Sequence, residues 1–285
     1  MAHVKKVFLT IDVDFTNYLS HVNFDEMEVV FDKLKAIFIE FPEVKSTWYI
    51  RIDDQIKSLH KKPDYIFIKH NAKLDWLRNT GHQLAWHHHA YKFENHKWKQ
   101  ELEITKVKNA IERNARIALE YGLESCRMGW GYHTNETMKL VDDLGFTTDS
   151  SAIPRPNYAW ETSKKNWEIT PQSPYHPSLL DYRTAGVSPL KILEVPFSTT
   201  QVSAASDTEK NIIRYINPAY HTGTFKQAVN SYKYPDLVIV VHPYELIKHK
   251  GENSSLIAFN IDTFRTNLKY LINEKFEFQV INDLL

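Results

Sequence analysis

Two aspartates, Asp12 and Asp14, close the segment "KKVFLTIDVDF", whose alternation from Val7 to Val13 predicts a β-strand. Alternate side chains of a strand point to opposite faces, so both carboxylates would share one side at its carboxyl end. Two ionised carboxylates this close repel each other unless a cation or a shared proton offsets their charge. The spacing therefore favours a site that binds a cation or holds a proton. Two solvent-facing aspartates at a strand end are the structural alternative.

A run of three histidines stands in "GHQLAWHHHAY", residues 81–91, which holds four of the chain's fourteen histidines. If the segment is extended, His87 and His89 face one way and His88 the other. Two imidazoles on the same side of a strand can bind one metal ion, and a carboxylate from a neighbouring strand would complete an open ligand set. Packed or solvated histidines are the alternative, because a histidine run is a weak signal by itself.

Two further segments end in residues that could do chemistry. The apolar run in "DLVIVVHPYEL" stops at His242, whose ordinary pKa near 6.5 suits proton transfer at neutral pH. In "CRMGWGYH", Arg127 precedes a predicted tight turn at Gly129 and Gly131, and its guanidinium could pair with a carboxylate. The carboxyl end of a barrel strand is where catalytic side chains usually lie, which favours a functional role for both.

Strand-like and helix-like segments alternate along the chain, which predicts an α/β fold with a parallel sheet, open or closed into a barrel. After the first strand, β-type runs occur at 45–52, 82–89, 125–130, 146–151, 190–198, 236–242 and 276–281. Helical periodicity occurs at 31–41, 99–122, 134–145 and 260–275. No repeat or linker divides the sequence, so we expect one domain over residues 1–285.

Residues 151–190 interrupt this alternation with six of the chain's twelve prolines and several aromatic residues. An irregular stretch of that length in a compact domain is usually a functional loop or lid. The alternative is a structural excursion whose aromatic side chains only pack against the barrel.

The composition excludes several classes of protein. Lys and Arg total 35, as do Asp and Glu, so no net charge attracts the chain to nucleic acid or to an anionic membrane. The one cysteine, Cys126, excludes an intrachain disulfide framework and a cysteine-based zinc site. No apolar signal core or bilayer-spanning segment occurs, so we expect a reduced, soluble, cytoplasmic protein.

The motifs and their order resemble the polysaccharide deacetylase family, also called the NodB-homology domain or carbohydrate esterase family four. "FLTIDVDF", "GHQLAWHHHAY", "RMGWG" and "VIVVHPYEL" resemble its aspartate, histidine, arginine and final histidine motifs, from about residue 6 to residue 245. The resemblance implies a deformed (β/α) barrel of about seven parallel strands. It also implies metal-dependent hydrolysis of an N-acyl group on a sugar.

For the metal site, the resemblance implies that Asp14 and His87 are ligands. The family's usual second histidine lies four residues after the first, where this chain has Tyr91. We expect His89 to take its place, with His88 as the alternative if the segment is a turn. A carboxylate with two imidazoles accepts a divalent ion such as zinc, which we expect here, or cobalt, nickel or iron.

For catalysis, the resemblance implies that Asp12 is the general base, oriented by Arg127, and that His242 is the general acid for the leaving amine. The backbone N–H near Trp130 would stabilise the oxyanion. The family's fourth motif, which supports the arginine, has no clear match; "DYRT" around Asp181 is the nearest candidate.

We therefore expect a hydrolase that removes an N-acetyl or N-formyl group from a small or lipid-linked sugar in surface-glycan assembly of the O-antigen or lipopolysaccharide type. Within the same class of enzyme, the alternative substrate is a cyclic imide or ureide, as in related families. The alternative from a different class is a non-catalytic carbohydrate-binding relative that lost the metal, which the tyrosine at position 91 motivates. The presence of both a base and an acid favours the enzyme.

Overall fold

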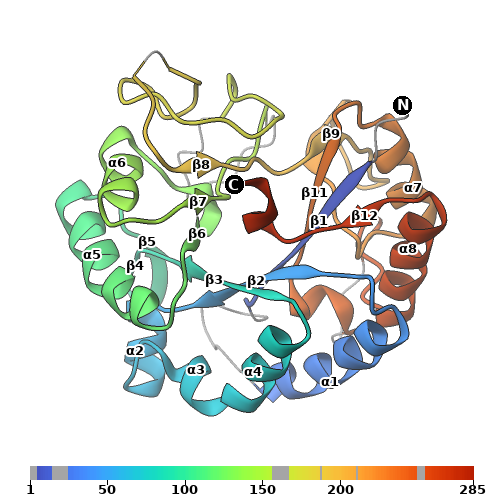
Figure 1. The fold of residues 1–285 in the computed structure, drawn as a ribbon, viewed down its shortest axis with the longest axis horizontal. Helices are drawn as coiled ribbons and strands as arrows, with labels where there is room; N and C mark the ends of the chain where they lie inside the picture. The colour runs from blue at the N-terminus through green and yellow to red at the C-terminus, as the bar shows by residue number, and fades with distance from the viewer. Residues whose placement is uncertain (1–4, 15–24, 156–166, 187, 210, 249–253) are drawn as a thin grey trace.

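A curled parallel sheet forms the centre of the computed structural model, which describes residues 5–14, 25–155, 167–186, 188–209, 211–248 and 254–285. Figure 1 shows the strands inside a ring that helices form at the left, bottom and right and irregular segments form at the top. Seven strands lie side by side in the order β11 (Asp236–Val241), β1 (Lys6–Asp12), β2 (Ser46–Arg51), β3 (Gln83–His88), β6 (Ser125–Met128), β7 (Thr148–Asp149) and β8 (Leu193–Glu194). β12 (Glu277–Phe278) also pairs with β1 in parallel. This is the predicted deformed (β/α) barrel.

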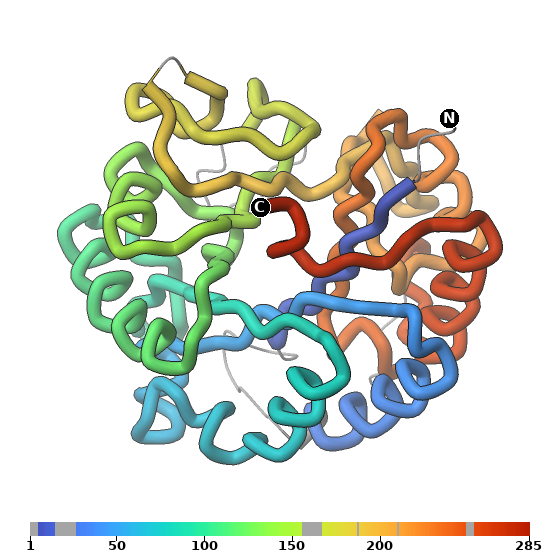
Figure 2. The backbone as a smooth tube through the Cα atoms, in the orientation of Figure 1, coloured from blue at the N-terminus to red at the C-terminus, as the bar shows by residue number. Residues whose placement is uncertain are grey.

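The sheet closes through irregular segments instead of a strand pair. Ser198 N–H donates to the Val238 carbonyl of β11 at 3.0 Å, and Val240 N–H donates to the Ile216 carbonyl at 3.2 Å. The residues after β8 therefore cover the edge of β11. The carboxyl terminus, with the 3₁₀ turn η3 (Ile281–Leu284), crosses the middle of the ring in Figure 2.

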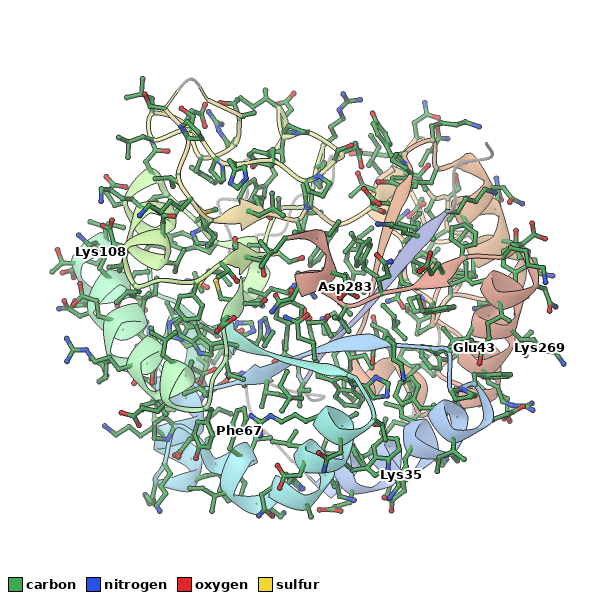
Figure 3. The ribbon with its side chains drawn as sticks, in the orientation of Figure 1. Lys35, Glu43, Phe67, Lys108, Lys269 and Asp283 are labelled. Atoms are coloured by element: carbon green, nitrogen blue, oxygen red, sulfur yellow. The ribbon has the colours of Figure 1, made fainter. Side chains whose placement is uncertain are left out.

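The helices connect the strands and pack on the outside of the sheet. Their bounds among the described residues are α1 (Asp25–Glu40), α2 (Asp54–His60), α3 (Tyr65–Lys69), α4 (Asn71–Asn79), α5 (Ile104–Glu120), α6 (Asn135–Asp143), α7 (Thr222–Ser231) and α8 (Ile261–Asn273). Figure 3 shows Lys108 and Lys269 pointing away from the barrel, as expected for the polar faces of amphipathic helices. None of the helices in the described part of the chain has the length and apolar character needed to cross a lipid bilayer.

β1 shows why the sequence pattern positions the site. Val7, Leu9, Ile11 and Val13 belong to the core shared with the helices, whereas Phe8 packs inside the barrel. Strand alternation therefore directs Thr10, Asp12 and Asp14 to the inner face, as predicted.

Smaller elements surround this barrel. They are the antiparallel hairpin β4 (Tyr91–Glu94) and β5 (Lys97–Gln100), the pair β9 (Thr199–Gln201) and β10 (Ile213–Tyr215), and the 3₁₀ turns η1 (Gly129–Gly131) and η2 (Pro243–Leu246).

The described residues between β7 and β8 form no helix or strand, which matches the predicted long loop over 151–190. Three of its aromatic residues pack inward. Trp167 is buried and donates its indole N–H to the Gly131 carbonyl at 2.8 Å, and Tyr175 is also buried. The Tyr182 ring lies edge-on to Trp167 at 4.8 Å. This part of the loop therefore supports the structure, while Tyr158 and Trp160 lie outside the described residues.

Candidate metal centre and active site

The residues singled out from the sequence meet at the carboxyl ends of the barrel strands, around a cavity of about 80 Å³. All seven predicted site residues line it, namely Asp12, Asp14, His87, His89, Arg127, Trp130 and His242. The remaining lining residues are Met128, Gly131, Ile153, Phe197, Tyr215 and Tyr244. Strand alternation puts Asp12 and Asp14, and likewise His87 and His89, on the inner face, and the strand order brings these pairs together with the remaining residues.

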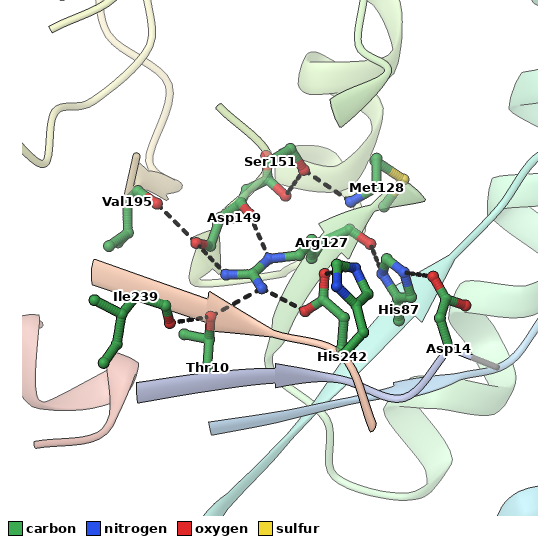
Figure 4. A network of polar contacts seen from close by, with 12 residues as sticks. Thr10, Asp14, His87, Arg127, Met128, Asp149, Ser151, Val195, Ile239 and His242 are labelled. Atoms are coloured by element: carbon green, nitrogen blue, oxygen red, sulfur yellow. Dashed lines mark hydrogen bonds and ion pairs between the residues drawn. The ribbon is translucent and has the colours of Figure 1, made fainter. Parts of the chain in front are cut away.

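Asp14, His87 and His89 converge on one point. Asp14 Oδ2 lies 3.4 Å from His87 Nε2 and 3.2 Å from His89 Nε2, and the two Nε2 atoms are 3.1 Å apart. All three residues are buried. The Arg127 carbonyl accepts a hydrogen bond from His87 Nδ1–H at 3.0 Å, so the lone pair of His87 lies on Nε2, towards Asp14 (Figure 4).

This arrangement fits a divalent metal ion. With bonds of 2.0–2.2 Å, two ligand atoms of a tetrahedral set lie about 3.3 Å apart, which matches the separations between these three atoms. Burial lowers the pKa of His89 to about 4, so the imidazole is neutral near pH 7. Burial alone would raise the pKa of Asp14, but His89, Arg51 and the polar contacts with both imidazoles hold it well below its ordinary value. No second cluster of potential metal ligands occurs within the described ranges.

His88, the alternative to His89 as the second histidine ligand, faces away from the cavity. His88 Nδ1–H donates to the Ile52 carbonyl at 3.3 Å, and the ring packs against Trp86 on the helix side of the sheet. Tyr91, which stands at the position of the family's second histidine, stacks on the His89 ring at 4.6 Å. His89 therefore lies beside Asp14, and the tyrosine supports it from behind.

A glycine makes room for His89. A Cβ atom at position 129 would lie 2.2 Å from His89 Nδ1 and 2.4 Å from Cγ, far inside contact distance. Gly129, read from the sequence only as a turn residue, is therefore required by the close approach of the imidazole ring.

Arg127 lies at the centre of the polar network drawn in Figure 4. Its Nη1 group donates to Asp12 Oδ1 and, at 3.0 Å, to Thr10 Oγ1, while Nε and Nη2 donate to the carbonyl and hydroxyl of Ser150 at 2.6 and 2.8 Å. The guanidinium is 1% exposed and lies over the Tyr49 ring at 3.9 Å. These contacts fix both the arginine and the Asp12 carboxylate.

Hydrogen bonds also fix the turn that follows Arg127. Met128 N–H donates to Ser151 Oγ at 2.7 Å, and that hydroxyl donates to Asp149 Oδ1 at 2.7 Å. Trp130 follows in η1 with a φ of +58°, in the left-handed region that few residues other than glycine adopt. Its backbone is thus in a conformation that the neighbouring contacts must stabilise.

His242 lies across the cavity from Asp12, with its Nε2 atom 4.0 Å from Asp12 Oδ2. Its other ring nitrogen, Nδ1, donates to Glu245 Oε2 at 3.2 Å, and that oxygen also accepts from Asn217 Nδ2 at 2.9 Å. Burial alone would lower the pKa of His242, but the charge and hydrogen bond of Glu245, with Asp12 and Asp14, raise it to about 9. The imidazole is therefore protonated near pH 7.

Comparisons with known proteins agree with this fold. No protein-family model and no curated protein sequence matches the chain. Among solved structures, a proposed polysaccharide deacetylase from Mycobacterium smegmatis is 13% identical with a TM-score of 0.55, covering 100% of this chain and 90% of that one. The protein has a NodB-like deacetylase fold. A family 4 carbohydrate esterase from Streptomyces lividans, solved with acetate, is 10% identical with a TM-score of 0.47 and coverages of 97% and 93%.

The deacetylase fold does not by itself define the reaction. A 4-alpha-glucanotransferase from Thermococcus litoralis matches with a TM-score of 0.50 and 13% identity, covering 98% of this chain and 38% of that one. Because one fold hosts different chemistries, the activity has to be argued from the side chains of the site.

Three features of the site on this deacetylase fold were not apparent from the sequence. Glu245 follows His242 by three residues, and Arg51 ends β2 beside Asp14; both spacings become informative only once the strand ends are known. The family's arginine-supporting motif had no clear match in the sequence, and Asp181, the nearest candidate, binds Arg183 at 2.8 Å within the loop. Ser150, two residues after β7 begins, holds Arg127 instead.

Proposed function

We propose that the protein is a metal-dependent hydrolase that removes an N-acyl group, acetyl or formyl, from a sugar. The observation that carries this proposal is the convergence of Asp14, His87 and His89 beside the Asp12–Arg127 pair, with His242 on the other side of the same cavity. Three ligands of this type leave positions open for substrate and water, as in catalytic metal sites.

We assign the metal ligands as Asp14, His87 and His89. When bound, a divalent ion polarises the acyl carbonyl and lowers the pKa of a water molecule beside it. Zinc is the ion we expect, and cobalt, nickel or iron would suit the same donors.

The chain's own groups then move the protons of amide hydrolysis. Asp12 accepts a proton from the attacking water at Oδ2, since Arg127 occupies Oδ1. The backbone N–H of Trp130 donates to the oxygen that becomes negatively charged. His242 Nε2–H then protonates the leaving nitrogen as the C–N bond breaks, giving a carboxylic acid and a free amine. The pKa of about 9 supports this role, because the imidazole carries its proton at neutral pH.

The cavity's size limits what enters it. A volume of about 80 Å³ suits an acyl arm rather than a whole sugar ring, whose remaining atoms would lie at the mouth. A small or lipid-linked sugar of surface-glycan assembly remains our prediction for the substrate, and the cytoplasm for its location.

The test is release of acetate or formate from a panel of N-acetyl and N-formyl amino sugars, free and lipid-linked, measured by proton NMR. Asp12→Asn should lower kcat by about 100-fold or more while the bound metal is retained. Asp181→Asn, which changes a carboxylate on the loop, is the matched control and should keep full activity. Unchanged activity in Asp12→Asn would exclude Asp12 as the base.

A further inference from the structure

One oxygen of Asp14 is held away from the metal site. Arg51 Nη1 donates to Asp14 Oδ1 at 3.2 Å, while Oδ2 faces His87 and His89. A carboxylate binds an ion in a bidentate manner through both oxygens, and an oxygen that accepts a hydrogen bond from a buried guanidinium is the weaker second donor. As long as Arg51 keeps its hydrogen bond, Asp14 therefore favours coordination through Oδ2 alone.

Arg51 itself is fixed by other buried groups. Its side chain is 0% exposed, and Nε and Nη2 lie 2.8 and 2.7 Å from Asp53 Oδ2. Nη2 also donates to Gln55 Oε1 at 2.6 Å. Asp53 caps α2, because its Oδ1 accepts the Ile56 N–H at 3.0 Å. The guanidinium is thus attached to the start of a helix by contacts other than the one with Asp14.

The same guanidinium approaches the ligand His89 through Tyr91. It lies 5.8 Å from the centre of the Tyr91 ring, which stacks on His89 with an angle of 17° between the planes. Tyr91 lines a separate groove with Glu101 and Arg113 and does not face the cavity of the metal site. Arg51 therefore lies behind two of the three metal ligands.

We propose that Arg51 is a positioning residue that restricts Asp14 to one coordinating oxygen and thereby selects ions that accept few ligands. Zinc and cobalt bind readily in four-coordinate sites, whereas calcium, magnesium and manganese take six or more oxygen-rich ligands. This inference rests on the proposed function, because it takes Asp14, His87 and His89 as the ligands. It adds a reason for the choice of metal that the ligands alone do not give.

The test compares metal binding, not activity. The wild type and Arg51→Met are loaded with cobalt, and the visible absorption spectrum reports the coordination number. We expect intense low-coordinate bands in the wild type and weaker bands in Arg51→Met, in which Asp14 is free to bind with both oxygens. The preference for zinc over manganese, measured by competition with a chromogenic chelator, should fall at least tenfold. That ratio is unaffected by the general gain in affinity from removing a nearby positive charge.

Two further variants keep the test decisive. Arg51→Met leaves the buried Asp53 carboxylate without its partner, and an unpaired buried charge destabilises the fold. The double variant Arg51→Met/Asp53→Asn avoids this cost because it removes both charges together. The control is Arg113→Met, which removes the partner of Asp54, the first residue of the helix α2 that Asp53 caps. It should match the wild type. An unchanged spectrum and zinc preference in the double variant would overturn the role of Arg51. A wild type that binds no ion would instead refute the proposed metal site itself.

Discussion

Glu245 raises the pKa of His242 more than any other group does, and the variant Glu245→Gln tests this contribution. The substitution keeps the size of the side chain and an acceptor for Asn217, but it removes the negative charge 3.2 Å from His242 Nδ1. Glu245 is the largest of the influences that raise this pKa to about 9, whereas burial acts in the opposite direction. Loss of an adjacent opposite charge typically changes a pKa by about 1 to 3, so we expect a value near 7 in the variant.

The consequence for catalysis follows from the fraction of protonated imidazole. At pH 8, a group with a pKa of about 9 is roughly 90% protonated, and one with a pKa of about 7 is roughly 10% protonated. Because His242 must donate a proton, kcat/KM of Glu245→Gln should fall at pH 8 and change little at pH 6. The alkaline limb of the pH profile therefore moves to lower pH.

The same pKa contributes to stability. Raising it from 6.5 to about 9 on folding corresponds to about 3 kcal/mol. The folded state favours the protonated form of His242, so the raised pKa increases the free energy of unfolding at low pH. This stabilisation is fully present below pH 6.5 and is lost as the pH rises through about 9. Glu245→Gln should lose most of it.

The assay needs no substrate. The His242 ring resonance of metal-free protein is followed by NMR between pH 5 and 10 and is assigned by its absence in His242→Gln. Glu101→Gln changes another buried carboxylate, one that binds the Leu102 and Glu103 N–H groups, and serves as the control. A pKa that stays near 9 in Glu245→Gln would refute this explanation of the acid.

Two substitutions test other parts of the site. Gly129→Ala places a methyl group 2.2 Å from His89 Nδ1, and overpacking of about 1–3 kcal/mol should weaken zinc binding about tenfold or more by chelator competition. Gly223→Ala, whose Cβ meets nothing within 4 Å, should leave zinc affinity unchanged, and equal losses in both variants would contradict the steric argument. Arg127→Met leaves Asp12 buried without its cation, so urea denaturation should show a loss of about 3–5 kcal/mol. Arg265→Met removes a partner of Glu40 on the surface and should change the stability far less than Arg127→Met; similar losses for both would show that the Arg127 network adds no special stability.

Much of the barrel was predictable because its strands have strong local patterns. The alternation around Asp12 and in "LAWHHH" predicted which side chains share the inner face, and the structure confirms that His87 and His89 lie together beside Asp14. The hairpin 91–100 was not predicted, since its strands are short and mix aromatic residues with lysines. Helix α7 was also missed; its apolar stripe is short, with Phe225 among its few buried residues.

The rest of the site depends on contacts between segments far apart in the chain. Arg51 lies in the β-type run 45–52 and was read only as part of a strand, because its partner Asp14 is 37 residues away. The requirement for glycine at position 129 arises from His89, which directly follows the neighbouring strand β3. Asp181, the nearest sequence candidate for the motif that supports the arginine, pairs with Arg183 in the loop instead. Local patterns thus predict which face a residue occupies, whereas its partners depend on strand order and loop path.

The most direct test of the metal site is the metal content of the purified protein, measured by elemental analysis for the wild type, Asp14→Ala, His89→Ala and His88→Ala. We predict about one divalent ion per chain in the wild type and in His88→Ala, and almost none in the other two variants. A wild type that stays empty after zinc is supplied, or a His89→Ala variant that keeps its ion while His88→Ala loses it, would contradict the site described here.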